Sequence, residues 1–296
     1  MKKMRRKPSW LKAEMLGASN TAHLNQLLLK YKLHTVCESA RCPNRGECFE
    51  KGSAVFLIMG DECTRNCRFC AIKTTTKPLP LDAEEPRRVA ELTKELKLKH
   101  VIITSVTRDD IEDGGSGHFA KTIREIRKIC GNKIYIEVLT PDFLGDSTAI
   151  ETVIMETPTI FNHNLETVKR LYPEIRPLAD YERSLMLLRF VKENAPEIIT
   201  KTGIMVGLGE TDKEVYALME HARKAGVDML TVGQYLQATQ KNIAVNEYIH
   251  PGIFRKYKEI GEDMGFLYVE SGPLVRSSYY SRDLETIINN EGKRGM

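Results

Sequence analysis

Short apolar runs rich in β-branched residues recur along the chain from residue 54 onward, and amphipathic stretches separate them. These runs predict strands at residues 54–59, 100–106, 133–139, 159–162, 199–206, 229–235 and 267–270. Helical periodicity between the runs predicts helices at residues 81–98, 117–129, 147–156, 165–171, 181–194, 212–225 and 252–264. Strands that alternate with helices are typical of βαβ units. The pattern therefore indicates a parallel sheet, either closed into a barrel or left partly open.

The residues before this pattern carry little strand signal. A capped amphipathic helix is expected at residues 19–30, and the cysteine-rich stretch 37–48, which contains proline and glycine, is expected to be a loop. We therefore expect three parts: an N-terminal extension at residues 1–53, a barrel unit at residues 54–271 and a C-terminal extension at residues 272–296.

Composition narrows the class of protein further. The 296 residues are 42% hydrophobic and 28% charged, which is typical of a globular chain large enough to bury a substantial core. The net charge of +4 is too small to argue for nucleic acid binding. The chain contains no apolar run of about 18 residues, and no apolar signal-peptide segment follows its basic start. We therefore expect a soluble, cytoplasmic protein with no membrane partner.

Six of the seven cysteines form two triplets. The first triplet has the spacing C-x4-C-x5-C and consists of Cys37, Cys42 and Cys48. The second triplet has the spacing C-x3-C-x2-C and consists of Cys63, Cys67 and Cys70. In a reducing compartment such clusters indicate metal sites rather than disulfides. Structural zinc usually takes four ligands, so three thiolates favour an iron–sulfur cubane with one open iron; zinc knots or core cysteines are the alternatives.

The second triplet directly follows the predicted strand at residues 54–59, where the carboxyl end of a barrel strand opens toward ligands. C-x3-C-x2-C at this place is typical of enzymes that reductively cleave S-adenosylmethionine. In such enzymes the amino and carboxylate groups of the cofactor chelate the open iron, and an electron from the cluster releases a 5′-deoxyadenosyl radical.

Polar residues near the ends of later strands are candidate contacts for this cofactor. Thr104 and Ser105 could meet its amino acid part, with an ordinary strand end as the alternative. Glu137 and Asn162 could hydrogen-bond the ribose hydroxyls, with a structural polar network as the alternative. Lys201 lies in mid-strand and could pair with a carboxylate.

Longer motifs occur throughout the chain: RKPSWLK at 6–12, CESARCPNRGEC at 37–48, GDECTRNCRFC at 60–70, SVTRDDIEDGGSGHF at 105–119, EVLTPDF at 137–143, FNHNLETV at 161–168, KTGIMVGLGET at 201–211, VGQYLQ at 232–237 and GPLVRSSY at 272–279. With these motifs the chain closely resembles the lipoyl synthase family of radical S-adenosylmethionine enzymes over nearly its whole length. Two departures from the family pattern follow VGQYLQ: Ala238 stands in place of a proline and Asn242 in place of a histidine.

The resemblance implies a fold and a reaction. The fold is a partial (β/α)6-type TIM barrel of the radical SAM kind, with N-terminal and C-terminal extensions. The reaction is a sulfurtransferase reaction that inserts two sulfur atoms, at carbons 6 and 8, into an octanoyl chain carried on a lysine of a lipoyl carrier domain. S-adenosylmethionine starts each insertion, and an auxiliary iron–sulfur cluster is consumed as the sulfur donor.

The resemblance also implies roles for the cysteines. The second triplet holds the radical-generating 4Fe–4S cluster, and the first triplet holds the auxiliary 4Fe–4S cluster. The fourth ligand of the auxiliary cluster is a serine of the RSSY motif, with Ser278 favoured over Ser277. A serine oxygen is a harder and weaker partner for iron than a thiolate, which suits a cluster that must be dismantled.

The expected partners follow from the same resemblance. They are octanoylated lipoyl carrier domains, namely the lipoyl-bearing subunits of 2-oxoacid dehydrogenases and the glycine cleavage H protein. An electron donor such as ferredoxin or flavodoxin and an iron–sulfur carrier for cluster repair are also implied. The basic start, which includes Arg6 and Lys7, is either a solvated tail or a docking arm for an acidic carrier.

Rival functions come from two classes. One is another radical enzyme, such as a biotin synthase relative or a methylthiotransferase. The first is not expected to show C-x4-C-x5-C before its barrel, and the second needs an additional domain for which residues 1–53 leave little room. The other class is a zinc-bound nucleic-acid module that uses the basic start, which metal analysis would separate from an iron–sulfur enzyme.

Overall fold

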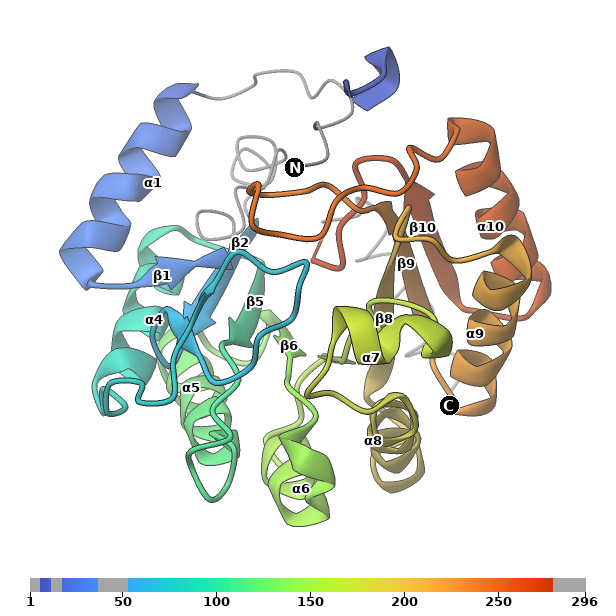
Figure 1. Ribbon diagram of the computed structural model, residues 1–296. Coiled ribbons are helices and arrows are strands. Elements are labelled where there is room, and N and C mark those ends of the chain that lie inside the picture. Colours follow the sequence, from blue (N-terminus) through green and yellow to red (C-terminus); the bar gives the residue numbers. More distant parts are fainter. Residues whose placement is uncertain (1–5, 12–17, 37–52, 279–296) are drawn as a thin grey trace.

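The computed structural model describes residues 6–11, 18–36 and 53–278. Within these residues an eight-stranded sheet has the order β1-β2-β5-β6-β7-β8-β9-β10 (Figure 1). Its strands are β1 (His34–Thr35), β2 (Ser53–Ile58), β5 (His100–Ser105), β6 (Tyr135–Leu139), β7 (Ile160–Asn162), β8 (Ile199–Val206), β9 (Met229–Gln234) and β10 (Tyr268–Gly272). β1 is antiparallel to β2, and every other neighbouring pair is parallel. The expected parallel sheet is confirmed.

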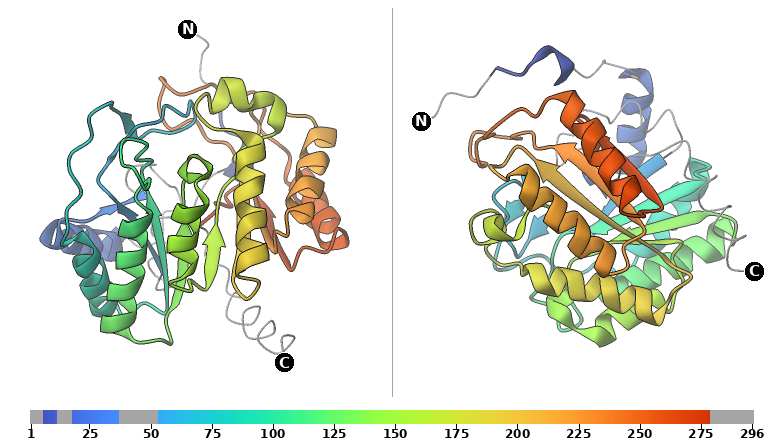
Figure 2. Two further views of the ribbon diagram at one scale, coloured as in Figure 1. Left: turned by 90° about the horizontal axis from the view of Figure 1, so that it is seen from below. Right: turned by 90° about the vertical axis from the view of Figure 1, so that its right-hand side faces the viewer.

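Helices follow most of the parallel strands and lie on the outer side of the sheet, as the views from below and from the side show (Figure 2). They are α1 (Ala18–Tyr31), α4 (Glu85–Glu95), α5 (Ser116–Cys130), α6 (Ser147–Ile154), α7 (Tyr172–Ile175), α8 (Tyr181–Asn194), α9 (Asp212–Lys224) and α10 (Pro251–Asp263). The sheet curves into an arc whose edge strands β1 and β10 do not pair with each other (Figure 1). The barrel is therefore partial. None of the described helices is long and apolar enough to cross a bilayer.

The two faces of each strand explain why the sheet takes this shape. In β5, Val101 and Ile103 pack with the outer helices in the large core, whereas Ile102 points to the other face and packs with Val55. Side chains alternate across a strand, so a run with apolar residues at every position is buried on both faces. The β-branched runs in the sequence are therefore the strands of a sheet with a filled interior and a helical cover.

Part of that interior is polar. Lys201 on β8 donates through Nζ to Glu137 Oε1 on β6 at 2.9 Å, and Asn162 Nδ2 donates to the same oxygen at 2.9 Å. His100 Nε2 lies 3.5 Å from Glu137 Oε2. Burial alone would raise the pKa of Glu137, but the charge of Lys201 and the neighbouring hydrogen-bond donors lower it to about 2. Lys201 does pair with a carboxylate, and that carboxylate is the protein's own Glu137.

Replacing Lys201 with methionine is expected to destabilise the fold by about 3–5 kcal/mol near neutral pH, because Glu137 would keep a buried charge without the lysine that balances it. The contribution of Glu137 to stability is present above its unfolded pKa of about 4.3 and is lost as the pH falls toward 2. In urea unfolding, the difference in unfolding free energy between the unchanged protein and Lys201→Met should therefore be smaller near pH 3 than near pH 7. Lys169→Met, which breaks an exposed pair with Glu182, should cost less than about 1 kcal/mol at either pH.

One predicted element is wrong. Residues 165–171 were expected to be helical, but the chain stays extended past β7, and a helical segment begins only at Lys169 (η3, Lys169–Leu171). Glu166 bridges to β8, since its amide donates to Gly203 O at 2.9 Å and its carbonyl accepts from Met205 N at 2.8 Å. This backbone pairing buries Leu165 in the core without a helix. The apolar spacing at 165–171 therefore reflects a non-helical segment packed on the sheet at 165–168, followed by a single helical turn.

Candidate active site

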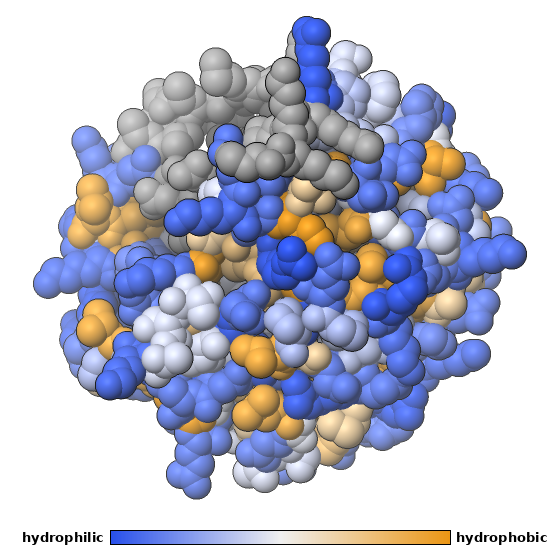
Figure 3. Space-filling model, viewed as in Figure 1, coloured by the Kyte–Doolittle hydropathy of each residue, from blue (hydrophilic) through white to orange (hydrophobic). Residues whose placement is uncertain are grey.

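A cavity of about 550 Å³ opens at the carboxyl ends of the parallel strands. The ends of β5, β6, β8 and β9, the segment after β7, and residues 275–278 contribute to its walls. On the face shown in Figure 3, apolar side chains gather near the middle of an otherwise mostly polar surface. Ligands of open and closed α/β barrels bind at this edge, so the cavity is the candidate site.

The second triplet surrounds part of this cavity. Cys63, Cys67 and Cys70 are free, half-buried thiols, and all three line the cavity wall. The loop that carries them follows β2 and contains a short strand, β3 (Glu62–Cys63), which pairs with β4 (Lys73–Thr74). Cys63 Sγ accepts hydrogen bonds from Thr107 N at 3.3 Å and Arg65 N at 3.4 Å. The first triplet lies outside the described residues.

The chemistry of these thiols fits a 4Fe–4S cluster. Within residues 6–11, 18–36 and 53–278, no three ligating side chains converge on one point as they would around a single metal ion. In a cubane each cysteine binds a different iron, so three thiols spread around a cavity suit a cluster. Burial raises the pKa of Cys67 and raises that of Cys70 to about 12. Cys67 and Cys70 must therefore release protons when they bind iron.

The segment after β7 forms a polar wall of the cavity. Asn164 Nδ2 donates to Glu166 Oε1 and to Ser277 Oγ, each at 3.0 Å. Asn164 Oδ1 is buried and has no hydrogen-bond partner among the described residues. His163 Nδ1 donates to Thr140 O at 2.9 Å, and burial lowers the pKa of His163 to about 4, so its ring is neutral near pH 7. Asn164 and Glu166 therefore offer the cavity an amide and a carboxylate side by side.

Arg176 supplies a buried positive charge at the same wall. Its Nη1 donates to Asn164 O at 3.0 Å and to Tyr172 Oη at 2.9 Å, and its guanidinium lies 5.1 Å from the centroid of the Tyr172 ring. Its Nε has no hydrogen-bond partner among the described residues. Although burial dominates at Cys67 and raises its pKa, the charge of Arg176 acts in the opposite direction. A cation in this position can bind an anionic group near the thiols.

The cofactor candidates from the sequence divide into two groups. Thr104 and Ser105 line the cavity; Thr104 Oγ1 donates to Leu139 O at 3.0 Å, whereas Ser105 Oγ has no partner among the described residues. The other three candidates are absent from the lining and belong to the buried cluster inside the barrel: Glu137, Asn162 and Lys201. Their placement favours the structural alternative. Asn164, Glu166 and Arg176, which sequence reasoning missed, occupy the wall instead.

The loop after β9 closes against the cysteine loop. Asn242 Nδ2 donates to Cys70 O at 2.6 Å and to Arg68 O at 3.3 Å, and Asn242 Oδ1 accepts from Thr239 Oγ1 at 2.7 Å. Ala238 of the same loop lines the cavity. The two departures from the family pattern therefore stand beside the cysteines, and the amide of Asn242 fixes the carbonyl of Cys70.

Residues 275–278 form the last part of the cavity wall and rest on two glycines of the sheet. A Cβ on Gly233 would lie 2.1 Å from Val275 O, and a Cβ on Gly203 would lie 2.8 Å from Ser277 Cβ. Ser278 lines the cavity, while the hydroxyl of Ser277 is engaged by Asn164. The absence of side chains at these two positions of β8 and β9 lets the segment lie across the strands.

Gly233→Ala is expected to push residues 275–278 away from the sheet, because the clash is with a backbone oxygen that no rotamer change can move. Overpacking of this kind costs about 1–3 kcal/mol. Amide hydrogen exchange at Val275–Ser278 should accelerate while that of the other strands changes little. At Gly252, at the start of α10, an added Cβ would contact only side-chain atoms, at 3.2 Å and beyond. Gly252→Ala should therefore leave the exchange pattern unchanged.

Comparisons with known proteins agree with this geometry. Residues 57–222 match the family model of the radical SAM superfamily. Lipoyl synthase of Caldanaerobacter subterraneus subsp. tengcongensis is 55% identical over 93% of this chain and 96% of the relative. Lipoyl synthase of Rubrobacter xylanophilus is 50% identical over 94% of this chain and 86% of the relative. That of Azotobacter vinelandii is 50% identical over 93% of this chain and 85% of the relative.

Solved structures share the fold at low sequence identity. Methylornithine synthase superposes with a TM-score of 0.56 at 14% identity and covers 96% of this chain and 95% of its own. SuiB of Streptococcus suis, bound to S-adenosylmethionine, gives a TM-score of 0.54 at 13% identity over 73% of this chain and 49% of its own. These likenesses concern the arrangement of strands and helices.

Proposed function

Since the chain belongs to the lipoyl synthase family of the radical SAM superfamily, we propose that it inserts sulfur at carbons 6 and 8 of an octanoyl chain carried on a lysine of a lipoyl carrier domain. The observation that carries this proposal is the position of the second triplet, whose three thiols line one cavity at the carboxyl ends of the barrel strands. The identity of about half the residues over nearly the whole chain supports the same reaction.

We assign the 4Fe–4S cluster and its cofactor to the walls of this cavity. Bound by Cys63, Cys67 and Cys70, the cluster supplies the electron that cleaves S-adenosylmethionine. The amide of Asn164 and the carboxyl group of Glu166 are suited to hydrogen-bond ribose hydroxyls, because they present an unpaired amide oxygen and a carboxyl group side by side. The guanidinium of Arg176 is suited to the carboxylate of the cofactor.

The apolar part of the cavity lining suits an alkyl chain. Side chains of Phe69, Ile72, Leu236 and Val275 line it, and burying an eight-carbon chain against such a surface is favourable at about 0.8 kcal/mol per methylene group. An apolar lining also excludes water from a reactive carbon centre. The octanoyl chain would thus bind in the same cavity as the thiols and the residues assigned to the cofactor.

The auxiliary cluster belongs, in this proposal, to the first triplet with Ser278 as fourth ligand. Ser278 supports the assignment because it lines the same cavity, whereas the hydroxyl of Ser277 already accepts a hydrogen bond from Asn164. A sulfur donor held at Ser278 would face the same space as the radical-generating cluster. Two clusters that share one cavity are what a sequential abstraction and insertion requires.

The partners follow from the chemistry. The substrate is an octanoylated carrier domain, the reductant a ferredoxin or flavodoxin, and an iron–sulfur carrier rebuilds the consumed cluster; we place the reaction in the cytoplasm. Lys7 is exposed and borders the cavity, so the basic start lies where an acidic carrier would approach. Attraction of this kind is weakened by salt.

The function is tested by anaerobic turnover. Reconstituted protein should hold about eight iron atoms per chain in two 4Fe–4S clusters. With an octanoyl-lysyl peptide, S-adenosylmethionine and dithionite, it should release 5′-deoxyadenosine and give the lipoyl peptide by mass spectrometry. Deoxyadenosine without any sulfur-containing peptide, at full iron content, would show that the chain is a radical enzyme with a different reaction.

A further inference from the structure

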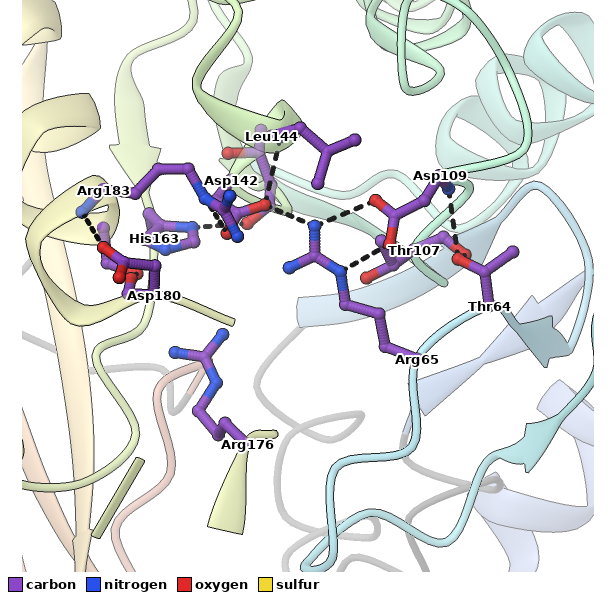
Figure 4. A network of polar contacts seen from close by, with 12 residues as sticks. Thr64, Arg65, Thr107, Asp109, Asp142, Leu144, His163, Arg176, Asp180 and Arg183 are labelled. Atoms are coloured by element: carbon purple, nitrogen blue, oxygen red, sulfur yellow. Dashed lines mark hydrogen bonds and ion pairs between the residues drawn. The ribbon is translucent and has the colours of Figure 1, made fainter. Parts of the chain in front are cut away.

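Arg65, which stands between Cys63 and Cys67, links the cysteine loop to two other loops of the barrel (Figure 4). Its side chain is only 3% exposed. Nε donates to Asp109 Oδ2 at 2.7 Å, and Nη2 donates to Asp109 Oδ1 at 2.9 Å and to Asp142 Oδ1 at 2.5 Å. Asp109 follows β5 and Asp142 follows β6. One planar guanidinium therefore joins three consecutive strand-to-helix connections.

Backbone contacts strengthen the same junction. Thr64 N donates to Thr107 O at 3.0 Å, Asp109 N donates to Thr64 Oγ1 at 3.1 Å, and Thr107 N donates to Cys63 Sγ at 3.3 Å. The first half of the cysteine loop is thus fixed to the connection after β5. The second half is held separately, through Asn242 and the loop after β9.

The other end of the link is rigid. Asp142 is fully buried and forms a second ion pair, with Arg183 Nε at 2.8 Å. Its Oδ1 also accepts a hydrogen bond from Leu144 N at 3.2 Å. That last bond closes a turn in which Phe143 and Leu144 both have positive φ, of 45° and 53°. Non-glycine residues keep such a conformation only where their surroundings over-determine it. Asp142 is therefore a fixed point to which Arg65 is tied.

The charges in this network balance. Arg65 and Arg183 carry two positive charges, and Asp109 and Asp142 carry two negative ones. Burial would raise the pKa of Asp142, but the hydrogen bond and charge of Arg65 lower it well below its usual range, so the carboxylate stays ionised. An arginine fork can meet both carboxylates in one plane, whereas a lysine ammonium cannot.

We propose that Arg65 is a positioning residue for the radical-generating cluster: it fixes Cys63 and Cys67 relative to the connections after β5 and β6 through Asp109 and Asp142. The inference rests on the proposed function only in that the second triplet holds a cluster. Reacting groups must be held within about 0.5 Å of productive geometry. If the cysteine loop were no longer tied to Asp142, its cluster would lose iron more readily. More molecules of cofactor would then be cleaved for each lipoyl group formed.

The test compares Arg65→Lys with Arg68→Lys. Both changes keep a positive charge within the cysteine loop, but the Arg68 guanidinium is half exposed and pairs only with the exposed Glu174 among the described residues. For Arg65→Lys we expect iron loss to a chelator to accelerate about tenfold, within the range known for residues that orient metal ligands. The electron paramagnetic resonance signal of the reduced cluster with S-adenosylmethionine should change shape, and more deoxyadenosine should form per lipoyl group. Arg68→Lys should match the unchanged protein in all three.

A measurement on the metal-free chain separates positioning from cluster chemistry. Amide exchange at residues 63–65 and 107–109 should accelerate in Arg65→Lys and not in Arg68→Lys. If Arg65→Lys fails to fold, Asp109→Asn removes one side of the link at a carboxylate that is 25% exposed, and it should show the same changes. Normal iron retention, resonance signal and exchange in these variants would overturn the inference. Failure of the unchanged protein to make a lipoyl peptide would instead count against the proposed function.

Discussion

Cys67→Ala is expected to bring both deoxyadenosine and lipoyl product below detection under anaerobic, reducing conditions. Cys67 is the middle cysteine of the second triplet in sequence, is half-buried on the cavity lining, and interacts with the charge of Arg176. Two thiols cannot retain the cubane in the geometry that leaves one iron open. Since the cofactor carries the difficult chemistry, losing its cluster removes the radical and every later step.

The measurement is deoxyadenosine release by liquid chromatography, together with iron analysis, which should fall by about four atoms per chain. Cys130→Ala provides the matched control, because that half-buried thiol lies on α5, contacts Ala90 O at 3.6 Å and is remote from the cavity lining. Full iron content and normal deoxyadenosine release in Cys67→Ala would show that the radical-generating cluster has other ligands.

Ser278→Ala is expected to separate the two halves of the reaction. Cleavage of S-adenosylmethionine should continue, since the second triplet and the polar wall remain intact. Sulfur insertion should fall by at least about tenfold, the effect expected when a metal site loses part of its ligation. Deoxyadenosine would then accumulate with little lipoyl peptide, and the iron content should fall toward that of one cluster.

Ser277→Ala gives the contrast. It removes one of the two acceptors of Asn164 Nδ2 and should act on the cofactor side, raising the KM for S-adenosylmethionine while iron content stays full. Reversed results for the two serines would assign the ligand to Ser277. Normal sulfur insertion in both variants would mean that neither serine holds the auxiliary cluster.

The strands and most helices could be predicted because their signals are local. Runs such as HVIITS at β5 are buried on both faces, and α8 begins and ends at the predicted residues. The error at residues 165–171 arose because apolar residues spaced three apart also occur in an extended segment that pairs with β8 at Glu166. The very short strands β1, β3 and β4 carry too few residues for any periodicity to show.

The spacing of the second triplet predicted thiols beside a ligand site, and the structure places all three on the cavity lining. The ligand role of Ser278 came from the family resemblance alone and stays a prediction. The polar residues of the cavity wall could not be predicted, because strand alternation gives the face of a residue but not its height in the barrel. Asn162 and Lys201 are paired in register on neighbouring strands, which places them in an inner layer with Glu137. Asn164 stands two residues further along the same extended chain and reaches the cavity. That difference depends on where β7 stops pairing, which the sequence does not mark.

The contact of residues 275–278 with Gly203 and Gly233 can form only late in the synthesis of the chain. The ribosome delivers these residues after every described strand, so a nascent chain that already contains β2 through β10 still lacks one wall of the cavity. The thiols of the second triplet can be loaded with iron while that side is open, whereas a centre that needs Ser278 must wait for the segment to settle onto Gly203 and Gly233. With Ser278 as the proposed ligand of the auxiliary cluster, that cluster would be completed after the radical-generating one.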